Sequence, residues 1–142
     1  MVIMEKELNK EIKILVVDDS TGSRKLVMKL FKDLGFTNFQ EAADGSKAWE
    51  TIVKSPASFD LIVSDVNMPN MTGIELLKLV RGHQQTKETP FLIISAETTK
   101  KQMFEALKEG VSSYLVKPVD EKDLKEKLSS IERLVMKENP RP

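Results

Sequence analysis

Short apolar runs alternate with segments of helical periodicity along the whole chain, and this alternation limits the fold more than any other feature of the sequence. The five expected strands cover residues 12–17, 39–43, 61–64, 91–94 and 114–116. Strands that alternate with helices favour parallel pairing through right-handed crossovers, with helices on both faces of one sheet. The sequence therefore predicts an α/β fold, a doubly wound five-stranded parallel sheet with five helices.

The polarity of the strands predicts their order in the sheet. Residues 14–17, 61–63 and 91–94, in the first, third and fourth expected strands, are continuously apolar, as central parallel strands buried on both faces are. Residues 39–41 and 112–114 are more polar and suit the two edges. This assignment matches the flavodoxin-like order 2-1-3-4-5, in which ligands bind at the carboxyl ends of the strands where the order reverses.

Several helix ends are also predicted from single residues. Gly35 is expected to end the first helix in a left-handed conformation. The last helix is expected to start at Asp120, a natural N-cap, and to continue through Val135 until Pro140 forbids it.

Length and composition narrow the class of protein. The 142 residues fit one domain, and Lys plus Arg equal Asp plus Glu at 22 each, so no overall charge draws the chain to nucleic acid or a membrane surface. Cysteine is absent, which excludes disulfides and thiolate metal sites. The sequence has neither a run of about 20 apolar residues nor a secretory signal. We therefore expect a cytoplasmic protein without DNA binding or membrane insertion, with a polar extension at 1–10, one domain at 11–137 and a tail at 138–142.

Reactive side chains follow four of the five expected strands. Asp18 and Asp19 follow the first, Asp65 the third, Ser95 the fourth and Lys117 the fifth. Three carboxylates brought together repel one another unless a cation compensates, and Mg²⁺ prefers such oxygen ligands together with a phosphate oxygen. A phosphoryl group bound between the metal and Asp65 would present its remaining oxygens to the Lys117 ammonium and the Ser95 hydroxyl. The set therefore suits phosphoryl transfer to an aspartate.

Each of these residues also has an ordinary structural interpretation. An aspartate after a strand is most often a helix N-cap or a loop residue, and Lys117 before Pro118 could be an exposed lysine next to a turn. Four strand ends rarely carry an acid pair, an acid, a hydroxyl and a lysine by chance. The sequence therefore favours function more strongly for the set than for any single member.

The motif residues together resemble the receiver domain of two-component response regulators. They are Asp18-Asp19, Asp65 with Met68-Pro69 and Gly73, Ser95-Ala96, and Lys117-Pro118. The match spans roughly residues 12–136, and residues 64–77 are most similar to single-domain chemotaxis regulators. The resemblance implies that a histidine kinase donates a phosphoryl group to Asp65. It also implies phosphorylation-dependent binding of a target protein, such as a flagellar motor switch, and a phosphatase as a further partner.

The resemblance implies a metal site as well. Its ligands would be Asp19 and Asp65 directly, Asp18 through water, and Asn67 through its backbone carbonyl. The ion would be Mg²⁺, with Mn²⁺ as the alternative.

The remaining roles also come from the resemblance. Ser95 and Lys117 would bind the phosphoryl group, the lysine being positioned by a cis peptide to the proline that follows it. Ser95 and Tyr114 would form the switch: the hydroxyl moves toward the phosphoryl group, the aromatic ring turns inward, and the surface of the fourth helix, fifth strand and fifth helix changes its partner affinity. Asn67 and Glu97 would tune autodephosphorylation.

Three functions compete at this point. The first is a stand-alone, monomeric receiver that signals by reversible binding, in chemotaxis or in another phosphorelay, because only six residues follow Met136. The second is a Mg²⁺-dependent phosphatase that forms an aspartyl phosphate with turnover. Such enzymes resemble this site but need a second aspartate two residues after the nucleophile, where this chain has Asn67. The third is a pseudo-receiver that only binds partners, and the complete set of reactive residues argues against it.

Overall fold

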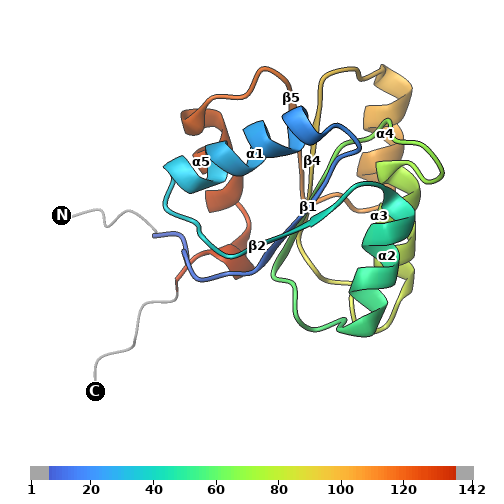
Figure 1. Ribbon diagram of the computed structural model, residues 1–142, viewed down its shortest axis with the longest axis horizontal. Coiled ribbons are helices and arrows are strands. Elements are labelled where there is room, and N and C mark those ends of the chain that lie inside the picture. Colours follow the sequence, from blue (N-terminus) through green and yellow to red (C-terminus); the bar gives the residue numbers. More distant parts are fainter. Residues whose placement is uncertain (1–6, 137–142) are drawn as a thin grey trace.

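One parallel sheet forms the centre of the molecule, and the computed structural model describes residues 7–136 (Figure 1). Its strands lie in the order β2-β1-β3-β4-β5, which confirms the predicted topology. The strands are β1 (Ile14–Val17), β2 (Phe39–Ala42), β3 (Leu61–Ser64), β4 (Phe91–Ser95) and β5 (Ser113–Val116). The helices are α1 (Thr21–Asp33), α2 (Gly45–Lys54), α3 (Gly73–Gly82), α4 (Lys100–Lys108) and α5 (Glu121–Ser129), followed by the 3-10 helix η1 (Glu132–Leu134).

Helices cover both faces of the sheet. In Figure 1, α1 and α5 lie on one side and α2, α3 and α4 on the other. Successive side chains of a strand point to opposite faces, so Ile14 and Val16 of β1 enter the core under α1 and α5, whereas Leu15 and Val17 enter the core under α2 and α3. This two-sided burial explains why β1 is wholly apolar and why β3 and β4 are apolar up to the serine that ends each of them.

The register of the sheet brings the ends of the strands level. Val17 of β1 pairs with Ala42 on one side and with Ser64 on the other. At the opposite edge, Ser95 of β4 pairs with Val116 of β5. The residues that directly follow these positions therefore share one edge of the sheet.

The helix ends follow local chemistry, with one difference from the prediction. Gly35 adopts the predicted left-handed conformation, with φ of 104°. The last helix, however, ends at Ser129 and not near Val135. The Ser130 hydroxyl donates to the carbonyl oxygen of Lys127 at 2.7 Å, and serines that bond to nearby backbone in this way compete with helix continuation.

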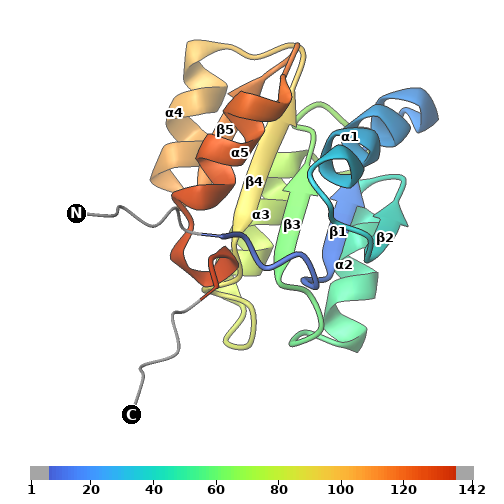
Figure 2. The same cartoon turned by 90° about the vertical axis from the view of Figure 1, so that its left-hand side faces the viewer.

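The N-terminal segment lies beside the C-terminal segment (Figure 2). Leu8 forms an antiparallel bridge with Val135 and is only 4% exposed. The backbone N–H of Asn9 donates to the carbonyl oxygen of Leu134 at 2.8 Å. Residues 1–6 of the predicted extension and the predicted tail at 138–142 lie outside the described residues. Between residues 7 and 136, no helix has the length and apolar character that crossing a bilayer requires.

Candidate functional site

Three carboxylates meet at the carboxyl ends of β1 and β3. Oxygens of Asp18, Asp19 and Asp65 all lie within 4.8 Å of one another. Within residues 7–136 they are the one group of three or more His, Cys, Asp or Glu side chains that could share an ion. Asp18 is buried and Asp19 is exposed. A set made only of carboxylate oxygens fits a hard divalent cation, so the residues present fit the predicted kind of metal site.

Asp65 is held by its immediate neighbours. Its Oδ1 accepts hydrogen bonds from the backbone N–H of Val66 at 2.7 Å and from the Ser95 hydroxyl at 2.8 Å. Its backbone carbonyl oxygen accepts from the Ser64 hydroxyl at 2.7 Å. A Cβ placed on Gly73 would lie 2.0 Å from that same carbonyl oxygen, so glycine is required where α3 begins. The backbone of Asp65 is therefore held in place, and its carboxylate faces the hydroxyl of Ser95, as predicted.

Lys117 lies in the site with Asp18 as its ionic partner. Its ammonium is 3.5 Å from Asp18 Oδ2 and donates a hydrogen bond to the Ser23 hydroxyl. Ser23 in turn donates to Asp18 Oδ2 at 2.6 Å. The peptide bond between Lys117 and Pro118 is cis, as the resemblance implied. Sequence reasoning missed Ser23, although a hydroxyl near the start of the helix that follows an acid pair is a usable signal.

Arg24 holds the end of β1 in place. Its guanidinium donates to the carbonyl oxygen of Asp18 at 2.7 Å and to Glu41 Oε1 on β2 at 2.8 Å. The hydrogen bond from Arg24 lowers the pKa of Glu41 below its ordinary value. Arg24 therefore links the backbone of Asp18 to the edge strand β2, another contact that the sequence alone did not suggest.

The two predicted tuning residues are in direct contact at the rim of the site. Asn67 Nδ2 donates to the backbone carbonyl oxygen of Glu97 at 3.0 Å. The Ser95 hydroxyl is 3.1 Å from that same oxygen. Asn67 Oδ1 accepts from Gln102 Nε2 of α4 at 3.0 Å, and Gln102 was not among the predicted residues.

Tyr114, the predicted aromatic switch, lies on the edge strand β5. Its hydroxyl forms a hydrogen bond with the Thr98 hydroxyl, and its ring packs against the core beneath α2 and α3. Thr98 belongs to the segment between β4 and α4 that also contains Glu97. The structure thus places the predicted site residues around one edge of the sheet, while their individual roles stay predictions.

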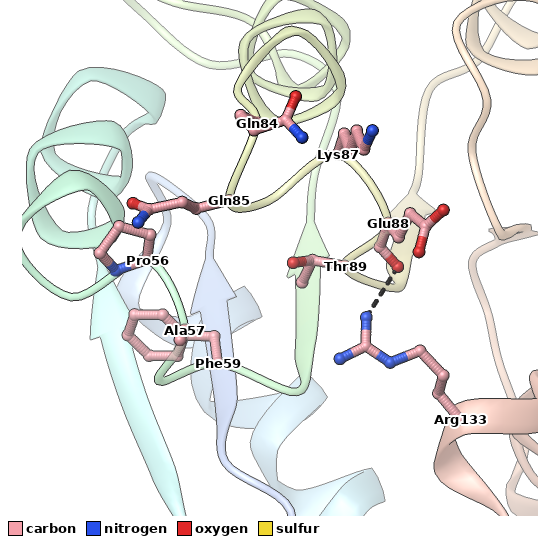
Figure 3. A pocket seen from close by; sticks show the side chains of 9 residues that line it. All are labelled: Pro56, Ala57, Phe59, Gln84, Gln85, Lys87, Glu88, Thr89 and Arg133. Carbon is pink, nitrogen blue, oxygen red and sulfur yellow. Dashed lines mark hydrogen bonds between the residues drawn. The ribbon is translucent and has the colours of Figure 1, made fainter.

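A separate pocket of about 290 Å³ lies at the opposite, amino-terminal end of the strands (Figure 3). Its walls come from the segments that precede β3 and β4, with Phe59 and Thr89 among them, and from Arg133 of η1. Arg133 donates to the carbonyl oxygen of Glu88 at 2.9 Å. No predicted site residue lines this pocket, so it is not part of the acidic site.

Known proteins resemble this chain both in sequence and in structure. The family model "Response regulator receiver domain" matches residues 14–129, which include every predicted site residue. Chemotaxis protein CheY-3 of Vibrio cholerae is 48% identical over 132 residues, which is 92% of this chain and all of that protein.

Solved structures are similar as well. Chemotaxis protein CheY4 of Vibrio cholerae, crystallised at pH 4.0, gives a TM-score of 0.74 at 40% identity, covering 85% of this chain and 98% of that one. A chain in the CheX-CheY-BeF3-Mg²⁺ complex of Borrelia burgdorferi gives a TM-score of 0.77 at 27% identity, covering 85% and 89%.

Proposed function

The chain belongs to the response regulator receiver family, and we propose that Asp65 is the residue that accepts the phosphoryl group from a histidine kinase. The protein is a CheY-like receiver that signals in chemotaxis through phosphoaspartate, and it is a signalling protein rather than an enzyme with turnover of an external substrate. Asp18 is already paired with the Lys117 ammonium and accepts a hydrogen bond from Ser23, and Asp19 is exposed. The bond from Ser95 to Asp65 is the observation that carries the choice, because Asp65 accepts from a hydroxyl without the lysine ion pair that Asp18 has.

The metal of this site is proposed to be Mg²⁺, with Mn²⁺ as the alternative. Asp18, Asp19 and Asp65 would hold it together with the backbone carbonyl of Asn67. When bound, the ion would supply positive charge to the phosphoryl oxygens.

The chain's own residues perform the transfer. A carboxylate oxygen of Asp65 forms a bond to phosphorus while the bond from phosphorus to the histidine nitrogen of the kinase breaks, and that nitrogen keeps the electron pair. The Ser95 hydroxyl, which now donates to Asp65 Oδ1, can turn its hydrogen toward a phosphoryl oxygen. The Lys117 ammonium forms an ion pair with Asp18, whose carboxylate lies close to that of Asp65. A phosphoryl group on Asp65 would give the lysine a second anionic partner.

The target is proposed to bind at α4 and β5. Met103, Phe104 and Leu107 of α4 and Val116 of β5 are large apolar side chains left exposed, Phe104 at 70%. Large apolar side chains left exposed on neighbouring elements are typical of a protein interaction surface. We expect a cytoplasmic monomer that binds a flagellar motor switch protein and is dephosphorylated with the help of a phosphatase. Service in another phosphorelay is the alternative.

Phosphorylation provides the direct test. With Mg²⁺ and a phosphorylated kinase or acetyl phosphate, the wild-type protein should acquire a single base-labile label. The label should disappear in Asp65→Asn, which removes the nucleophile, and persist in His83→Ala. Failure to label the wild type would contradict the proposal.

Two further measurements separate the alternatives. Many turnovers of a simple phosphomonoester per chain would favour the phosphatase. A pull-down with and without beryllofluoride should enrich a motor switch protein only in the activated state, and enrichment of a different phosphorelay protein would favour the other pathway.

A further inference from the structure

A chain of hydrogen bonds joins the first turn of α4 to the rim of the acidic site. Thr99, the N-cap of α4, donates its backbone N–H to Gln102 Oε1 at 3.1 Å. Gln102 Nε2 donates to Asn67 Oδ1 at 3.0 Å. Asn67 Nδ2 donates to the carbonyl oxygen of Glu97 at 3.0 Å. The chain starts and ends on backbone groups between β4 and α4, and it passes through the residue two positions after Asp65.

Those backbone groups fix the orientation of both side-chain amides. The N–H of Thr99 can only donate, so the Gln102 atom that faces it must be the oxygen. The carbonyl of Glu97 can only accept, so the Asn67 atom that faces it must be the nitrogen. Both assignments place a Gln102 donor opposite an Asn67 acceptor. The three hydrogen bonds are therefore mutually consistent and select one orientation of the Asn67 side chain.

We propose that Gln102 is a positioning residue that holds the Asn67 side chain across the rim of the phosphorylation site and thereby slows hydrolysis of the phosphoaspartate. This inference rests on the proposed function of Asp65. Asn67 is exposed, so without partners its side chain would populate several rotamers. With both amide atoms bonded, it spans from the segment after β3 to the segment after β4. It does so beside Ser95, whose hydroxyl is within reach of both Asp65 and Glu97.

Hydrolysis needs a water molecule on the side of phosphorus opposite Asp65. The water oxygen forms a bond to phosphorus, the bond from phosphorus to the Asp65 oxygen breaks, and the carboxylate leaves with the electron pair while the water loses a proton to solvent. A fixed side chain at the rim restricts the approach of that water. Release of Asn67 from Gln102 would open the approach.

Gln102→Glu isolates the contact with Asn67. A glutamate keeps an oxygen for the Thr99 N–H, and glutamate is a favoured residue at this position of a capping box. It cannot donate a hydrogen bond to Asn67 Oδ1, because an ionised carboxylate only accepts. Lys101→Gln is the matched control, since it changes the net charge by the same amount in the same exposed turn of α4 without touching the hydrogen-bond chain.

The rate constant for loss of the label should rise about two- to twelvefold in Gln102→Glu, the range into which the net free energy of one hydrogen bond converts. Lys101→Gln should behave as wild type. In an Asn67→Ala background, Gln102→Glu should have no further effect, because the partner is gone. In metal-free, unphosphorylated protein, the NMR signals of the Asn67 side-chain amide should shift in Gln102→Glu and not in Lys101→Gln.

An unchanged or lower rate constant in Gln102→Glu, or the same ratio in both backgrounds, would overturn the inference. So would unshifted Asn67 amide signals. If the wild type takes up no label at all, the proposed function fails instead, and the amide signals alone then decide whether Gln102 positions Asn67.

Discussion

At the scale of single residues, the positive charge of Lys117 is paired with one acid of the site, Asp18. Asp18 also accepts a hydrogen bond from the Ser23 hydroxyl. Among the described residues, Asp65 Oδ1 accepts from the neutral Ser95 hydroxyl and the Val66 N–H. The lysine therefore compensates one acid of the cluster and leaves the proposed nucleophile with neutral donors. A phosphoryl group on Asp65 would bring new negative charge beside Lys117, so phosphorylation and the position of the lysine are coupled.

The Thr98 hydroxyl should hold Tyr114 in the orientation seen here. In Thr98→Val the hydrogen bond is lost with little change of shape, and a net bond of about 1 kcal/mol corresponds to roughly a fivefold change in the rotamer population of the ring. Because Tyr114 is the only tyrosine, the NMR spectrum of tyrosine-labelled protein reports this ring alone. Unchanged ring signals would contradict the prediction. Thr51→Val, which removes a hydroxyl bonded within α2, is the control and should leave them unchanged.

Sequence reasoning found the reactive residues but not all their partners. Asp18, Asp19 and Asp65 were placed together because parallel strands end at one edge, a rule that needs only strand order. Ser23 and Lys117 are 94 positions apart, and Gln102 and Asn67 are 35 apart. Such contacts depend on how helices pack beside the loops, and no local pattern in one sequence encodes them.

At the scale of elements, α3 begins directly against the proposed phosphoacceptor. The N–H of Gly73 donates to the carbonyl oxygen of Val66 at 2.8 Å, which closes the loop after β3. Thr72 and Glu75 then form a capping box that starts the helix. The sequence signal for this turn was strong, but only the structure shows that the glycine lies on the backbone of Asp65.

Gly73→Ala should destabilise the protein and disturb the site together. The added Cβ would overlap the carbonyl oxygen of Asp65, and relief of such overpacking typically costs about 1–3 kcal/mol. We expect a lower midpoint in urea unfolding and slower labelling of Asp65 by acetyl phosphate.

Gly22→Ala provides the control for this glycine. Gly22 lies in the first turn of α1, where an added Cβ would meet nothing within 4 Å. Alanine is the better helix former by up to about 1 kcal/mol, so stability should stay the same or rise. Equal losses of stability in the two variants would refute the assigned role of Gly73.

Helix periodicity located the five helices but misjudged the end of α5. Leu124, Leu128, Ile131 and Val135 recur at helical spacing, which favoured one long helix. In the structure the chain turns at Ser130 and continues as η1, which buries Leu134 in the core instead. The apolar pattern is compatible with both paths, so spacing alone could not distinguish them.

At the scale of the whole molecule, residues 7–10 pack against the core and against the segment that follows α5. Leu8 joins the core under α1 and α5. The Lys10 ammonium donates to the carbonyl oxygen of Leu34 at 2.5 Å and lies 4.8 Å from the centre of the Phe36 ring. Burial of this ammonium, with the charge of Lys125 nearby, lowers the pKa of Lys10. The described residues of the predicted polar extension thus contact both the turn that follows α1 and the C-terminal segment.

Leu8→Ala tests how much the packing of Leu8 into the core contributes to stability, separately from function. Loss of a buried leucine side chain typically costs about 2–5 kcal/mol, and we expect the lower half of that range because Leu8 lies at the margin of the core and its surroundings can relax. Leu26→Ala, the same change at a leucine that is 66% exposed, should cost less than about 0.5 kcal/mol. Urea unfolding measures both.

Labelling of Asp65 should survive in folded Leu8→Ala protein, because Leu8 packs beside η1, away from the strand ends that carry the acids. Equal stability losses in the two leucine variants would show that the segment is not part of the core. A loss of labelling in fully folded Leu8→Ala would show instead that the two ends of the sheet are coupled.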